Sequence, residues 1–176
     1  MVFYCYVDAD FAGLWSFEGV QDPVCIKSRT GYVLMLGGCP LTFKSKLQTE
    51  IALSTLEAEY IALSQSMREL LPLRNLLQEI GKNQSWILVK HGLMQSTVFE
   101  DNNRALGLAT SPKLTPWTKH IAVKYYFFRS HISDKEGDNK GVIIKRIDTK
   151  EQIADIFAKG LITEKFAYVR KLLLGW

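Results

Sequence analysis

The sequence predicts an α/β fold, an α+β arrangement in which helices pack on a mixed sheet of about five strands. Two observations indicate it: three β-rich runs come first, and from residue 54 onward helical repeats alternate with short apolar runs. A length of 176 residues with 47% hydrophobic content is enough for one compact core. We therefore expect a single domain over residues 1–176, with the core in about 1–160 and an amphipathic tail at 161–176.

The first three strands are expected to form a meander. Residues 2–7 are apolar, aromatic or β-branched, as in a strand buried on both faces, and this run ends at Asp8. Residues 31–36 and 41–44 have the pattern of two further strands, and the Gly37-Gly38 pair predicts a tight turn between them.

A long helix is expected to follow at residues 54–80. Its apolar side chains recur every three or four positions, at Leu56, Tyr60, Leu63, Met67, Leu70, Leu73 and Leu77. Ser54 and Glu57 form a capping box at its start, and Gly81 supplies a stop. Pro72 removes one backbone donor, so we expect a kink or a restart there.

The second half of the chain alternates strands and helices. The expected elements are a strand at 97–100, a short helix at 102–109, a helix at about 118–131, a strand at 142–147 and a helix at about 150–159. A meander followed by this alternation predicts a sheet in the order 3-2-1-4-5, numbered along the chain. Asp8 would then end the central strand, and Asp101 would end the parallel strand beside it, where ligands of open sheets bind.

Composition narrows the classes of function. No apolar stretch approaches the roughly 18 residues that a membrane helix needs, and no leader pattern opens the chain, so we expect an intracellular protein without a membrane partner. Cys5, Cys25 and Cys39 are odd in number and form no CxxC pair, which argues against a disulfide framework or a thiolate zinc site. The net charge of +4 is modest, but basic residues gather in the second half, as expected of either a polyanionic partner or a solvated face.

The acidic residues form the pattern with potential chemistry. Asp8 and Asp101 directly follow apolar strands, and Asp155 lies about one turn into the last predicted helix. On the long helix, Glu59 lies on the apolar stripe, whereas Glu57 is turned roughly 200° away. Converging carboxylates that face a core need a compensating charge, and Mg²⁺ is the usual solution. Each carboxylate alone is more often solvated or a helix cap, but their order and spacing together favour a metal site.

Six motifs occur along nearly the whole chain: YVDADFAG (6–13), SRTGY (28–32), STLEAEYIAL (54–63), EDNNRAL (100–106), TKHI (118–121) and EQIADIFAK (151–159). In this order they resemble the ribonuclease H domain of copia-type LTR retrotransposon polyproteins. The set is specific to that family, although TKHI or AEY alone would carry no weight.

The resemblance implies the ribonuclease H-like fold and an endonuclease that cuts the RNA strand of RNA/DNA hybrids during reverse transcription. It implies that Asp8, Glu59, Asp101 and Asp155 are the catalytic residues and bind two Mg²⁺ ions, with Mn²⁺ as a substitute. The implied partners are the hybrid and an upstream reverse transcriptase domain of the same polyprotein, in a cytoplasmic virus-like particle or in the nucleus.

Basic and amide side chains are the candidate contacts to the nucleic acid: Lys113, Lys119, Lys124, Arg129, Asn102 and Asn103. Basic side chains hold phosphates without reading sequence, and the choice of RNA in the cut strand would rest on contacts to 2′-hydroxyls. One departure from the family concerns Arg146, which stands near the place where many ribonuclease H enzymes carry a loop histidine. We expect slow turnover for that reason.

Two other functions stay open. The same fold can lose its chemistry and persist as a catalytically inert module that binds nucleic acid or supports a reverse transcriptase, although the presence of all four acids argues against it. A nuclease of this fold could instead cut duplex DNA. The motifs favour the hybrid, because integrase-type relatives use three acids in a different arrangement.

Overall fold

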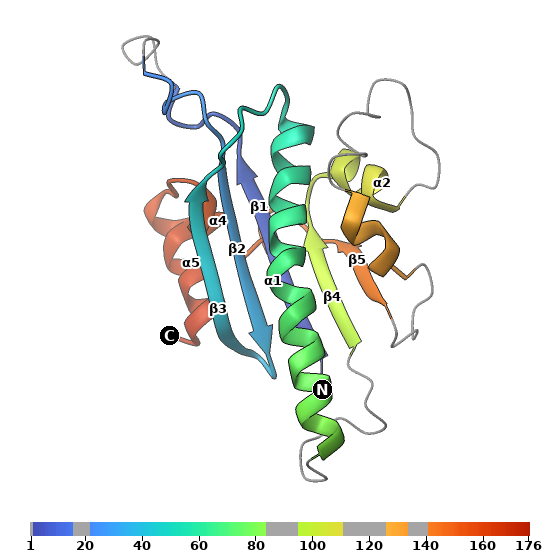
Figure 1. Ribbon diagram of the computed structural model, residues 1–176. Coiled ribbons are helices and arrows are strands. Elements are labelled where there is room, and N and C mark those ends of the chain that lie inside the picture. The colour runs from blue at the N-terminus through green and yellow to red at the C-terminus, as the bar shows by residue number, and fades with distance from the viewer. Residues whose placement is uncertain (1, 16–21, 84–94, 111–125, 134–140) are drawn as a thin grey trace.

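The computed structural model describes residues 2–15, 22–83, 95–110, 126–133 and 141–176, and these form a sheet with helices on both faces (Figure 1). The strands are β1 (Val2–Asp10), β2 (Arg29–Leu36), β3 (Cys39–Leu47), β4 (Gln95–Glu100) and β5 (Val142–Arg146). Their order is β3-β2-β1-β4-β5, which confirms the predicted sheet. β1, β2 and β3 pair antiparallel, whereas β4 pairs parallel with both β1 and β5.

The helices divide between the two faces of the sheet. They are α1 (Thr55–Asn83), α2 (Asn103–Thr110), the 3-10 helix η2 (Tyr126–His131), α4 (Asp155–Ala158) and α5 (Thr163–Leu174). In Figure 1, α1 crosses the front of the sheet, while α4 and α5 lie behind β2 and β3. The larger core lies under α1 and includes Phe3, Tyr60 and Val98, and a smaller one on the other face joins Val33 to Val169.

Local sequence accounts for the turn and the helix start. Gly37 and Gly38 both have positive φ angles, 60° and 84°, which a two-residue hairpin turn requires. At the start of α1, the Ser54 hydroxyl accepts a hydrogen bond from the Glu57 backbone N–H at 3.2 Å. The Glu57 carboxylate in turn accepts one from the Leu53 N–H at 2.8 Å. The predicted cap by Ser54 is therefore confirmed, while the Glu57 carboxylate reaches one residue further back than the capping box expects, to Leu53 instead of Ser54.

The long helix differs from its prediction in two respects. It continues through Pro72 without a restart, because the residues beside the proline pack against the core and compensate for one missing backbone donor. It also passes Gly81 and is described as far as Asn83, since glycine weakens a helix without necessarily ending it.

Two predicted helices in the second half were partly wrong. The helix expected at about 150–159 is α4, which begins at Asp155 rather than near residue 150. The residues before it form turns, in which the Asp148 carboxylate accepts the Lys150 N–H at 2.8 Å. Of the helix expected at 118–131, residues 118–125 lie outside the described part, and the remainder is the 3-10 helix η2. It stops where Ile132 bridges to Val142 at the sheet edge.

The cysteines are free thiols in three different environments. Cys5 is buried in the main core, Cys25 is half-buried and Cys39 is exposed on β3. Burial raises the pKa of the Cys5 thiol to about 12, so this thiol is neutral. Of the helices in the described ranges, none combines the length and apolar character needed to cross a bilayer.

Candidate metal centre

Asp8 and Asp101 meet at the edge of the sheet where β1 and β4 end. These strands run parallel with Tyr6 opposite Phe99, so the residues two positions further along each chain lie side by side. Carboxylate oxygens of Asp8, Asp101 and Glu59 all lie within 4.8 Å of one another. The prediction that Asp8 and Asp101 are adjacent is therefore confirmed.

Glu59 reaches this edge from the first turns of α1. Its neighbour Ala58 is held by the buried amide of Gln48, whose nitrogen donates to the Ala58 carbonyl at 2.9 Å and to the Thr30 hydroxyl at 3.1 Å. Glu59 is 4% exposed, while Glu57 is half-buried and caps the helix. Helical phase thus identified the buried glutamate correctly, but it gave no indication of Gln48.

Asp155 lies close to the three-carboxylate group but outside it. It is the first residue of α4, which packs tightly against β2 at Gly31, the residue that pairs with Asp8. A Cβ at Gly31 would lie 2.6 Å from the Ala158 nitrogen and 2.9 Å from the Ala154 carbonyl oxygen. Only glycine leaves room for this approach, and the approach brings Asp155 to the Asp8 side of the sheet.

A lysine joins Asp155 to the group. The Lys159 ammonium lies 2.8 Å from an Asp155 carboxylate oxygen and 3.2 Å from Asp8 Oδ1. A second ammonium, that of Lys165, contacts the other oxygen of Asp155. Burial alone would lower the pKa of Lys159, but the Asp8 and Asp155 carboxylates outweigh it and raise this pKa. The lysine is therefore firmly charged.

Burial dominates the electrostatics of Asp8. It raises the pKa of this carboxyl to about 7; the Lys159 charge opposes the shift, and the Asp155 and Asp101 carboxylates add to it. Burial weighs more on Asp8 than on Lys159, because the Asp8 side chain is 1% exposed and the Lys159 side chain is 32% exposed. Without a further cation, the charged form of Asp8 is disfavoured in the folded chain.

Glu100 is a fourth buried carboxyl that the sequence prediction missed. It is 0% exposed, and one of its oxygens accepts the Asn102 backbone N–H at 3.0 Å. Burial, opposed by that hydrogen bond and strengthened by the charges of Asp101 and Asp8, raises its pKa well above the usual value. Alternation along β4 carried the signal, since Glu100 shares a face with the core residue Val98.

The donor set fits a hard divalent cation. Asp8 Oδ2 and Glu59 Oε2 are buried and have no hydrogen-bond partner within the described residues. Burial, followed by the Glu100, Asp8 and Asp101 charges, raises the pKa of Glu59 well above its usual value. Buried, mutually repelling carboxylates with free oxygens are what Mg²⁺ and Mn²⁺ coordinate, and a bound ion would compensate their charge.

Gln152 fixes the two strands that supply the aspartates. Its side-chain nitrogen donates to the carbonyl of Val7 at 2.8 Å and, less closely, to that of Phe99 at 3.4 Å. These carbonyls directly precede Asp8 on β1 and Glu100 on β4. Sequence reasoning missed this residue, because an amide in a polar loop gives no sign of its partners.

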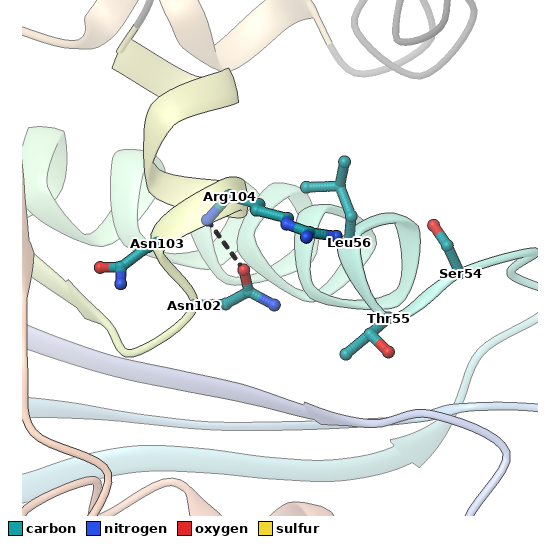
Figure 2. A pocket seen from close by; sticks show the side chains of 6 residues that line it. All are labelled: Ser54, Thr55, Leu56, Asn102, Asn103 and Arg104. Atoms are coloured by element: carbon teal, nitrogen blue, oxygen red, sulfur yellow. Dashed lines mark hydrogen bonds between the residues drawn. The ribbon is translucent and has the colours of Figure 1, made fainter.

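A pocket of about 440 Å³ lies beside the metal centre, between the N-termini of α1 and α2 (Figure 2). Its lining consists of Ser54, Thr55, Leu56, Asn102, Asn103 and Arg104. The Asn102 side-chain oxygen caps α2 by accepting the N–H groups of Arg104 at 2.9 Å and Ala105 at 3.2 Å. In Figure 2 the Arg104 side chain extends across the pocket toward α1. Asn102 and Asn103 were predicted as nucleic-acid contacts, and Arg104 was not.

Of the four basic residues predicted to contact nucleic acid, Arg129 alone lies within the described residues. Lys113, Lys119 and Lys124 lie outside the described residues. Arg129 is half-buried in η2, which packs against α1. Burial raises the pKa of Tyr60 and the Arg129 charge opposes it, so the guanidinium lies near the helix that carries Glu59.

The fold matches solved ribonuclease H structures. LC11-RNase H1, from a compost metagenome and crystallised with an RNA/DNA hybrid, superposes with a TM-score of 0.55 at 17% identity, covering 89% of this chain and 93% of that one. The N-terminal ribonuclease H domain of a Mycobacterium tuberculosis protein gives a TM-score of 0.55 at 10% identity, covering 97% and 96%. The chain therefore has the ribonuclease H-like fold.

Relatives in sequence are retrotransposon polyproteins. The Pol polyprotein from transposon TNT 1-94 of Nicotiana tabacum is 33% identical over 168 residues, which is 96% of this chain. Those from transposons RE2 and RE1 of Arabidopsis thaliana are 30% and 28% identical over 90% and 93% of it. The chain spans only 9 to 11% of the length of these relatives. No family model matches it.

The fold and the sequence relatives agree on the kind of domain. The molecule is a ribonuclease H-like domain with an acidic group able to hold a metal. More narrowly, it is the ribonuclease H domain of a copia-type retrotransposon Pol polyprotein.

Proposed function

We propose that this domain is an endonuclease that hydrolyses the RNA strand of RNA/DNA hybrids during retrotransposon reverse transcription. In this proposal Asp8, Glu59, Asp101 and Asp155 hold two Mg²⁺ ions, for which Mn²⁺ can substitute. The observation that carries it is the convergence of three carboxylates, two of which have buried oxygens without partners among the described residues. Residues 1–176 would act as one domain beside an upstream reverse transcriptase.

The bound ions would supply an activated water for in-line attack at phosphorus and neutralise charge on the leaving 3′-oxygen. The chain itself contributes rigidity. Asp8 and Asp101 stand at the ends of paired strands that Gln152 ties together, so the spacing of their carboxylates is fixed before substrate binds. No side chain is required as a covalent nucleophile.

The pocket between α1 and α2 would hold the sugar–phosphate backbone. The N–H groups of Arg104 and Ala105 in α2 are already used by Asn102. The donors proposed here are therefore side chains: the Arg104 guanidinium, the Asn102 amide nitrogen and the hydroxyls of Ser54 and Thr55. These groups bind phosphate and 2′-hydroxyl oxygens without reading bases. Arg129 would add a phosphate contact near the same helix. This arrangement suits an RNA/DNA hybrid, with which the structural neighbour LC11-RNase H1 was crystallised.

The test is cleavage of labelled hybrid, RNA duplex and DNA duplex in Mg²⁺, Mn²⁺ or chelator. We expect only the hybrid to be cut, and only with metal. Asp101→Asn should reduce cleavage by several orders of magnitude, since it removes a charge that the ions require while keeping the side chain's size. Glu57→Gln is the matched control, because glutamine can still cap α1. Hybrid binding without cleavage in the unmodified chain would favour the inert module, and cleavage of DNA duplex would contradict the substrate assignment.

A further inference from the structure

The Asp8 carboxylate faces two positions for a cation. One is shared with Glu59 and Asp101, whose oxygens lie within 4.8 Å of it. The other is filled by the Lys159 ammonium, 3.2 Å from Asp8 Oδ1 and 2.8 Å from Asp155. Within the described residues the two positions therefore differ, because an ion pair with a lysine is seen at the second and not at the first.

Lys159 can leave this position at little structural cost. Its side chain is 32% exposed, whereas Asp8 and Asp155 are 1% and 0% exposed. It directly follows α4, where the backbone is already extended, so movement of its long side chain need not disturb the helix. The carboxylates, in contrast, are fixed by β1 and by the packing of α4 on Gly31.

A divalent ion and an ammonium compete for the same oxygens. The ammonium is a single charge on a flexible stem, while Mg²⁺ and Mn²⁺ carry two charges and coordinate carboxylate oxygens directly. Asp155 also keeps the ammonium of Lys165 on its other oxygen, so removal of Lys159 leaves it partly compensated. The Asp8–Asp155 position is therefore the one that would resist a metal in the absence of substrate.

We propose that Lys159 is a built-in counter-cation that occupies the second metal position of the substrate-free domain and must withdraw before a second ion binds there. Asp8, Glu59 and Asp101 would hold a first ion while Lys159 stays in place, and Asp8 and Asp155 would become available to a second ion only when Lys159 moves toward solvent. This inference rests on the proposed metal-dependent function.

The experiment measures Mn²⁺ binding to the metal-free chain without nucleic acid, by electron paramagnetic resonance of the free ion. Lys159→Met keeps the aliphatic stem and removes the charge. We expect its second Mn²⁺ to bind at an ion concentration at least about tenfold lower than in the unmodified chain. Lys165→Met is the matched control, because it leaves Lys159 between Asp8 and Asp155, and its second Mn²⁺ should shift much less. Adding Asp155→Asn to Lys159→Met should abolish the gain.

Thermal unfolding supplies a second readout. In chelator, Lys159→Met should melt at a lower temperature, and saturating Mn²⁺ should raise its melting temperature by more than it raises that of the unmodified chain. If Lys159→Met does not fold without metal, Lys159→Gln keeps a hydrogen-bonding group without the charge and takes its place.

The outcomes distinguish a failure of the Lys159 inference from a failure of the proposed metal-dependent function. A second Mn²⁺ affinity that is the same with and without the Lys159 charge would overturn the inference while leaving the first metal position intact. Equal shifts in Lys159→Met and Lys165→Met would also overturn it, since net charge rather than position would then be the cause. Absence of any Mn²⁺ binding in every variant would overturn the proposed function as well.

Discussion

Replacing Asp8 by asparagine should stabilise the metal-free domain while removing the proposed nuclease activity. Burial raises the pKa of Asp8 to about 7 from an ordinary value of 3.8, so above pH 7 the folded chain must hold an unfavourable charge. Each pKa unit corresponds to about 1.4 kcal/mol, which sets an upper limit of about 4 kcal/mol on the gain at pH 8. Asparagine resembles the neutral acid in shape, and its oxygen can still accept from Lys159, so we expect a gain of about 1–4 kcal/mol.

The gain should depend on pH with a definite sign. Between about pH 4 and pH 7 the folded state keeps the Asp8 proton that the unfolded chain has lost, so the free energy of unfolding falls as pH rises through this window. Asp8→Asn lacks this contribution. The difference between the two proteins should therefore be small near pH 4, grow toward pH 7 and stay level above it.

Urea denaturation in chelator at pH 4.5 and pH 8 measures this difference, and the same titration in Mg²⁺ shows whether the metal recovers the cost. Mg²⁺ should stabilise the unmodified chain and leave Asp8→Asn nearly unchanged. The reasoning would be refuted if Asp8→Asn were less stable than the unmodified chain in chelator at pH 8. Attraction to Lys159 would then outweigh burial, and Asp8 would be a structural ion-pair partner rather than a metal ligand.

Three further changes probe the supports of the site. Gln152→Leu removes both hydrogen bonds to the ends of β1 and β4. It should lower the free energy of unfolding in urea by about 1–3 kcal/mol with or without metal, and a loss of stability confined to the metal-bound protein would contradict this prediction. Gly31→Ala should force α4 outward, which should cost about 1–3 kcal/mol of stability and weaken Mn²⁺ binding. Gly107→Ala is the control, because its Cβ would meet nothing within 4 Å, and equal effects of the two changes would contradict this prediction. Arg104→Ala should weaken hybrid binding and lower the slope of log affinity against log salt by about one unit, and an unchanged slope would mean that Arg104 contacts no phosphate.

The sequence predicted the sheet because its strands carry strong local signals. β1 opens with an unbroken apolar run at residues 2–7, Gly37 and Gly38 demand a tight turn, and the order of elements restricts the topology to few choices. Helix ends were less predictable, as α4 shows. Its start depends on where Gln152 finds partners on distant strands, and no periodic pattern records such a contact.

In the candidate site, too, some residues could be predicted from the sequence and others could not. The burial of Glu59 followed from helical phase, and the meeting of Asp8 with Asp101 followed from parallel strands. Lys159 and Glu100 were missed, because the first acts through a flexible side chain and the second sat beside a more conspicuous aspartate. Reading the alternation of β4 to its last residue would have found Glu100.

The Gln152 amide also bears on the order in which the domain is assembled. Its hydrogen bond to Val7 joins positions 145 residues apart, and the strand it anchors is among the first parts of the domain to be synthesised. Contacts between such distant parts of a chain form late and slowly. On a ribosome, the meander and α1 can therefore fold long before the carboxylates acquire their final spacing, and a nascent polyprotein would carry three paired strands without a complete metal site. Under the proposed function, hydrolysis would be withheld until the last segment of the domain has emerged.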